Sequence, residues 1–123
     1  MHPHMFLQLA HKRRDLYLLS KNILCGCYEL TRDIASDDKD LIAAQIRKAA
    51  IIVHRNLTEA LFLKRKRRKS ARKRYHTALQ GLILIGSGLE IVISLGWATP
   101  PEISVLEDQV QKAFKLVVKL QKK

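Results

Sequence analysis

The sequence predicts an all-α fold, an antiparallel up-and-down four-helix bundle. Apolar residues recur every three or four positions over four long segments, which is the spacing of one helix face. No segment shows the period-two alternation that is typical of a strand. Capping residues and Pro occur where these segments meet, and such short connections make neighbouring helices antiparallel. The 123 residues are enough for one hydrophobic core, so we expect a single domain over residues 1–123.

The first helix is expected at about residues 5–34, a stretch with no Pro and only one Gly. Its apolar stripe has a seven-residue repeat with further apolar residues between the repeats. The stripe consists of Leu9, Leu16, Ile23, Cys27, Leu30 and Ile34. Most of the basic residues lie off this stripe, which indicates a long amphipathic helix.

The second helix is expected at about residues 37–63. Ser36 can cap its start, and Asp37 and Asp38 favour the positive end of the helix dipole. Asn56 and Glu59 lie near its apolar face, where each either finds a hydrogen-bond partner or points at solvent. The residues predicted to face inward are Ile42, Ile46, Ala49, Val53, Leu57 and Ala60.

The third helix is expected at about residues 70–96, with Ser70 as its N-cap and Gly96 as the left-handed residue after its end. One apolar face comprises Tyr75, Ala78, Leu82, Ile85, Leu89 and Val92. The opposite face is apolar too, with Leu79, Ile83, Leu84, Ile91, Ile93 and Leu95. A helix that is apolar all round is either buried on both sides or spans a membrane.

A membrane span is the less favoured of these two interpretations of the third helix. Glu90 lies near the middle of the apolar segment, where an unpaired charge costs roughly 3 kcal/mol or more. The other three helices are amphipathic and offer the third helix a core. We therefore predict no membrane contact, and burial of this helix in the bundle and in a subunit interface.

The fourth helix is expected at about residues 100–121. Thr99 can cap it, and Pro100 occupies the first helical position, where its missing N–H is not needed. The residues predicted to face inward are Ile103, Leu106, Val110, Ala113, Val117 and Leu120. Lys119, Lys122 and Lys123 suit the negative end of the helix dipole.

A strongly basic block occupies residues 64–74, where nine of eleven residues are Lys or Arg and none is acidic. Such a block repels itself and must face solvent or a polyanion. We predict a basic turn at 64–69 and a phosphate-binding edge. Its residues are Lys64, Arg65, Lys66, Arg67, Arg68, Lys69, Arg72, Lys73 and Arg74. Lys12, Arg13 and Arg14 are weaker candidates, because the spacing does not show that they lie at the same height of the bundle.

The composition favours phosphate contact over base recognition. The net charge of +12 and the pI of about 10.1 favour nucleic acid or an anionic surface as partner. Aromatic residues make up only 6%, too few for a base-stacking platform. We therefore expect RNA or DNA as the ligand, with weak sequence preference.

No catalytic motif is present, so we predict a non-enzymatic protein with no catalytic residues, no metal and no cofactor. Glu59 and Glu90 lack the Glu-x-x-His pattern of di-iron bundles. Cys25 and Cys27 point to different helix faces and are predicted to be buried, unbridged residues of a cytoplasmic protein. The N-terminus does not resemble a secretory signal.

Several stretches resemble a family of small four-helix bundles. The run QIRKAA at 45–50 is similar to the family's Q-I-R-R-A-A, and NLTEA at 56–60 to its N-I-A-E-G. Ala78, Leu82, the LEI run at 89–91 and the LGW run at 95–97 match the A-x-G-S-L, L-E-I and L-G-Y pattern of its third helix. The family includes proteins encoded in ribosomal RNA intervening sequences and the Avd accessory proteins of diversity-generating retroelements. Ala60, Gln80, Gly81 and Leu84 depart from its pattern.

The resemblance, which spans about residues 16–120, implies a homopentameric ring with a basic surface. In the retroelement members such a ring binds nucleic acid and partners a reverse transcriptase that copies template RNA into mutagenised cDNA. Our first hypothesis is therefore a nucleic-acid-binding accessory protein of this kind. The alternative is a scaffolding bundle of the intervening-sequence type that docks an acidic protein partner.

Overall fold

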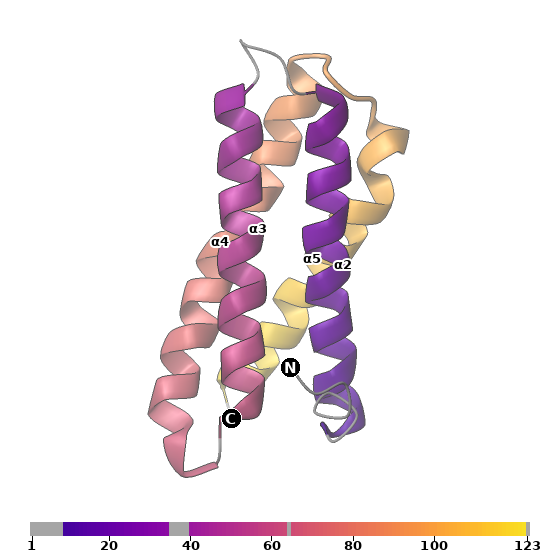
Figure 1. Cartoon of the computed structure of the whole chain (residues 1–123). Coiled ribbons are helices and arrows are strands. Elements are labelled where there is room, and N and C mark those ends of the chain that lie inside the picture. The colour runs from indigo at the N-terminus through magenta and orange to yellow at the C-terminus, as the bar shows by residue number, and fades with distance from the viewer. Residues whose placement is uncertain (1–8, 35–39, 64, 123) are drawn as a thin grey trace.

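The computed structural model describes residues 9–34, 40–63 and 65–122, and every regular element within them is helical. Four long helices run alternately up and down, with a short 3-10 turn before the third of them (Figure 1). The elements are α2 (His11–Ile34), α3 (Asp40–Phe62), η1 (Arg65–Arg67), α4 (Arg68–Ser94) and α5 (Pro100–Gln121). The predicted all-α fold with four helices is confirmed, and the arrangement is that of a four-helix bundle.

Each helix packs chiefly against two others. The substantial contacts join α2 to α3, α3 to α4, α4 to α5 and α5 back to α2. The helices therefore stand at the corners of a four-sided bundle in chain order, and grooves lie between α2 and α3, between α3 and α4, and between α2 and α5. The packing order of the helices determines which charged side chains lie on the same side of the bundle.

The predicted inward positions form the core. Ile23, Cys27, Val53, Leu57, Ala78, Ile85, Leu89, Val92, Ala113 and Val117 are fully buried, and the other predicted inward residues of α2 to α5 join the same cluster. Ile42, Leu30 and Leu120 are only partly buried, since they lie near helix ends. Leu9 precedes α2, which begins at His11 rather than at the predicted Met5; residues 1–8 lie outside the described residues.

Two of the predicted helix ends are confirmed. Gly96 has φ +74°, and the backbone N–H groups of Gly96 and Trp97 donate to the carbonyls of Ile93 and Val92 at 2.9 and 3.0 Å, which is a Schellman ending for α4. At the start of α5, the backbone N–H and the hydroxyl of Thr99 donate to Glu102 Oε1 at 3.1 and 2.9 Å. Pro100 is the first residue of the helix.

The predicted cap of the third helix is wrong. α4 begins at Arg68, two residues before Ser70, and its N-cap Arg67 makes no side-chain capping bond. The 3-10 turn η1 leads directly into the helix, so the chain is already helical when it reaches Ser70. The predicted Ser36 cap of α3 lies outside the described residues.

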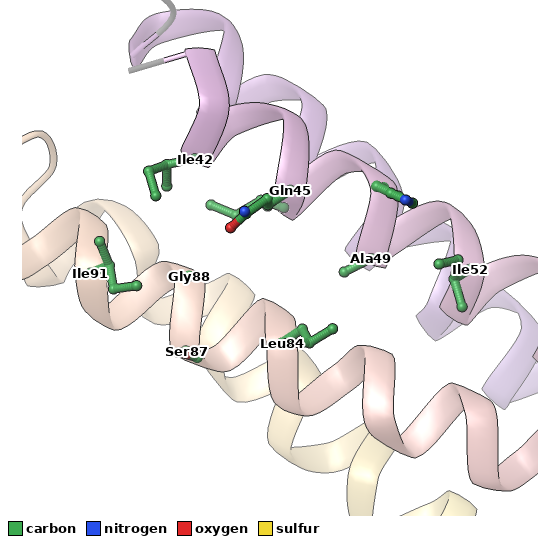
Figure 2. A pocket seen from close by; sticks show the side chains of 10 residues that line it. Ile42, Gln45, Ala49, Ile52, Leu84, Ser87, Gly88 and Ile91 are labelled. Atoms are coloured by element: carbon green, nitrogen blue, oxygen red, sulfur yellow. The ribbon is translucent and has the colours of Figure 1, made fainter. Parts of the chain in front are cut away.

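Glycine lets α3 and α4 approach closely. A Cβ atom on Gly81 would lie 2.6 Å from Val53 Cγ2, and one on Gly88 would lie 2.6 Å from Ile46 Cγ1. Both distances are shorter than a van der Waals contact, so these two positions require glycine at the observed helix separation. Gly88 also leaves a groove beside it between the projecting side chains of Leu84 and Ile91 (Figure 2).

The third helix is not buried on both sides within one chain. Its inner face is in the core, but Ile83, Leu84 and Leu95 are 58%, 61% and 54% exposed. By length and composition α4 could cross a membrane, a property that the core helix of a bundle shares. Its outer apolar face is therefore available to a partner surface.

Candidate nucleic-acid interface

One end of the bundle collects basic residues from three helices. The antiparallel order brings the first turns of α2 and α4 together with the last turns of α3 and α5 (Figure 1). We call this part of the surface the basic end. Its described cations are Lys12, Arg13, Arg14, Lys66, Arg67, Arg68, Lys69, Arg72, Lys73, Arg74, Lys119 and Lys122.

Most of the predicted block is open to solvent. The side chains of Lys66, Arg67, Arg68, Lys69, Arg72 and Lys73 are exposed. They come from η1 and the first two turns of α4, so a short length of chain holds six cations at the corner of the bundle. The side chains of Lys64 and Arg65, which were also predicted as site residues, lie outside what the structure describes.

Arg74 differs from the rest of the block. It forms an ion pair with Glu59, which comes from the last turns of α3, and both side chains are 42% exposed. An exposed pair of this kind contributes about 0–1 kcal/mol, so it aligns the two helices more than it stabilises them. Because Glu59 already neutralises part of its charge, Arg74 is a weaker candidate for phosphate contact than its exposed neighbours.

Asn56 is the other polar residue that the sequence placed near the inner face of α3. Its side-chain amide donates to the carbonyl of Ile52 in the same helix at 2.8 Å. Asn56 and Glu59 therefore each have a polar partner: Asn56 bonds to the backbone of its own helix, and Glu59 forms the ion pair with Arg74.

Arg13 belongs to the basic end. Its guanidinium Nη1 donates to the carbonyl of Leu61 at 3.0 Å, which satisfies one of the free carbonyls in the last turn of α3. Burial raises the pKa of Tyr75 in α4, and the positive charge of Arg13 offsets part of that rise. Arg13 therefore lies at the same height as the basic block, which its position in the sequence alone could not show.

Sequence reasoning did not assign Lys119 and Lys122 to the site. They were interpreted only as residues suited to a helix C-terminus, yet the antiparallel order places the end of α5 at the basic end. The predicted up-and-down topology was the signal that could have found them, because it implies which helix ends lie together.

The first turn of α4 is electrostatically unfavourable on its own. It contains no acidic residue, its N-cap has no side-chain hydrogen bond, and Arg68 and Lys69 lie at the positive end of the helix dipole. Like charges here repel one another and the positive end of the dipole. A bound polyanion would relieve this repulsion.

We expect Lys69→Glu to stabilise the protein while weakening its binding to polyanions. The carboxylate would meet the positive end of α4 and lie four residues before Lys73, and these two effects together amount to about 0.5–1 kcal/mol. Thermal unfolding at low salt measures the first effect, and titration with RNA or heparin measures the second. The control is Lys112→Glu, which makes the same change of two charge units at an exposed residue outside the basic end. Equal loss of binding in both variants would contradict a localised site.

A separate polar group joins α2 to α3 away from the basic block. The Ser20 hydroxyl and His54 Nδ1 are 2.8 Å apart, and the rings of Tyr17 and His54 lie with centroids 5.2 Å apart. Burial, and then the charge of Lys21, lowers the pKa of His54. These contacts position α2 against α3, and Ser20 is buried between the two helices.

Cys27 is buried, as predicted, but Cys25 is exposed, so the prediction for Cys25 is wrong. The two residues point to different faces of α2, and only one of those faces packs on the core. Burial raises the pKa of Cys27 to about 12, which makes its thiol unreactive. Among the described residues, no group of three or more His, Cys, Asp or Glu side chains could hold a metal ion.

Comparison with protein-family models, with curated proteins and with solved structures finds no significant match to this chain.

Proposed function

We propose that this protein is a non-enzymatic nucleic-acid-binding accessory protein that resembles Avd. In this proposal the basic end binds RNA or DNA through its phosphates. Identical subunits form a ring, a homopentamer as in the family that the chain resembles. The ring presents the nucleic acid to a partner reverse transcriptase in the cytoplasm. The observation that carries the proposal is the convergence of exposed cations from α2, α4 and α5 at one end of the bundle.

The charges at the basic end favour a polyanion over a small ligand. The exposed cations are spread over the ends of three helices, and two nearby acids, Asp15 and Glu59, are each paired with a basic side chain, His11 and Arg74. A helix start that carries cations instead of acids is less stable alone, and it gains most when phosphates bind there.

The type of contact supports nucleic acid read through its backbone. Tyr75, the aromatic residue closest in sequence to the block, is buried, so its ring offers no stacking surface. Lys and Arg side chains without an aromatic platform bind phosphates with little regard to sequence, and their affinity falls steeply with salt.

A titration of the purified protein with a short RNA, the matching DNA duplex and heparin tests the proposal. Fluorescence anisotropy at two salt concentrations should show micromolar or tighter binding to nucleic acid, with an affinity that falls by at least tenfold from about 50 to 200 mM salt. Binding to an acidic protein but to neither nucleic acid would instead favour the scaffolding alternative. Absence of nucleic-acid binding at moderate salt would refute the proposal.

A further inference from the structure

Two sides of the bundle carry opposite charges. The groove between α2 and α3 is lined by three cations and by no acid, whereas the groove between α2 and α5 is lined by three acids and by no Lys or Arg. We call the first the α3 surface, defined by Arg47, Lys48, Ile51, Ile52 and Arg55. We call the second the α5 surface, defined by Glu29, Asp33, Glu102 and Val105.

The α3 surface combines fixed charge with apolar side chains. Arg47 Nε donates to Thr31 Oγ1 at 2.6 Å, and its guanidinium carbon lies 4.9 Å from the centre of the Tyr28 ring. Lys48 and Arg55 are exposed. Lys48 and Ile52 also line the groove between α3 and α4 that Figure 2 shows, so the two grooves share these two residues.

The α5 surface has the complementary character. Glu29 and Asp33 are exposed in the last turns of α2, and Thr99 holds the carboxylate of Glu102 in the first turn of α5. Val105 lines the same groove as these acids and is 69% exposed. An exposed apolar side chain beside acids matches a surface on which the exposed Ile51 and the half-buried Ile52 lie beside cations.

We propose that the α3 surface of one copy of this chain binds the α5 surface of the next copy. This inference rests on the proposed ring assembly and names the two surfaces that make it. The contact is head-to-tail, because it joins two different surfaces, so every copy can use both of its surfaces at once. The isoleucines and Val105 supply apolar burial, and the charge pattern sets which surfaces meet.

The placement of the two surfaces favours a closed ring. They lie on neighbouring sides of the four-sided bundle, which share α2. Such sides face directions about 90° apart, and head-to-tail contacts at that angle close into a ring of roughly four or five copies instead of an open filament. All bundles would then stand parallel to the ring axis and point the same way, so all basic ends would gather on one face of the ring and bind one polyanion together.

Charge reversal tests the pairing. The variants Lys48→Glu/Arg55→Glu and Glu29→Lys/Asp33→Lys change exposed side chains, and each gives its chain two surfaces of like charge. We expect the wild type to sediment as an oligomer and each double variant as a 14.1 kDa monomer. The chain with all four changes should recover the wild-type mass, because both surfaces are then reversed together. Circular dichroism checks that every variant is folded.

Three outcomes would overturn the inference: a wild-type mass of 14.1 kDa at every concentration, wild-type mass in both double variants, or a monomeric four-change variant. The nucleic-acid proposal is measured separately on the monomeric variants. If they still bind RNA with a salt-dependent affinity, only weaker than the oligomer does, the basic end functions without the ring. Loss of the oligomer and loss of binding can therefore be told apart.

Discussion

The variant Lys66→Gln/Arg67→Gln/Arg68→Gln is expected to weaken nucleic-acid binding on the order of 100-fold at about 0.1 M salt. Each exposed cation that contacts a phosphate releases a counterion, and each lost contact should reduce the slope of log affinity against log salt by roughly 0.7–0.9. The three changes together should flatten the slope by about two to three. Anisotropy titrations of the variant at several salt concentrations measure both quantities.

The matched control for this variant removes the same charge from elsewhere on the bundle. Lys21, Arg32 and Lys112 are exposed and lie outside the basic end. Their replacement by Gln changes the net charge equally and should leave the affinity within a few-fold of the wild type. The loss should also be similar for all base sequences, because phosphate contacts carry no sequence information. If both triple variants bind equally well, the basic end is not the binding site.

The helix ends that were predicted correctly are those with local chemistry. α5 runs over Pro100–Gln121, as predicted, because Thr99, Pro100 and Glu102 specify its start without help from the rest of the fold. The start of α4 was predicted wrongly because no residue between 63 and 70 breaks a helix, so a weak cap signal at Ser70 could not mark the boundary.

The candidate site could be predicted only in part for a related reason. The basic block is visible in the sequence because its cations are adjacent. The contributions of Arg13, Lys119 and Lys122 depend on which helix ends meet, and that information lies in the packing order of the bundle. The same holds for the α3 and α5 surfaces, whose charges are separated along the chain by other residues and are brought together by neighbouring helices.

Composition alone also could not separate the two faces of α4. Ile83 and Ile85 are both isoleucines in an apolar stretch, yet Ile83 is 58% exposed and Ile85 is 0% exposed. A helical turn is 3.6 residues, so two positions apart means faces about 200° apart. Which of the two faces meets the core depends on α3 and α5, not on the residues of α4 themselves.

Replacing Ile85 by Ala should therefore lower the free energy of unfolding by about 2–5 kcal/mol, because it removes buried methyl groups and leaves a cavity in the centre of the bundle. The same change at Ile83 should alter the free energy of unfolding by no more than about 0.5 kcal/mol, because that side chain is largely in water already. Urea unfolding of the two variants, followed by circular dichroism, measures both values.

The pair is informative because residue type, helix and substitution are identical, so helix propensity cancels between the variants. Equal destabilisation at both positions, at a protein concentration where the chain is monomeric, would mean that α4 is covered on both faces within one chain, in conflict with the described packing. In the monomer, Ile85→Ala should lower the free energy of unfolding more than Ile83→Ala does. If the destabilisation by Ile83→Ala then grows with protein concentration, the outer face of α4 is covered on self-association. The two substitutions thus separate the contribution of the core from that of the outer face of α4, a face that takes no part in the proposed contact between the α3 and α5 surfaces.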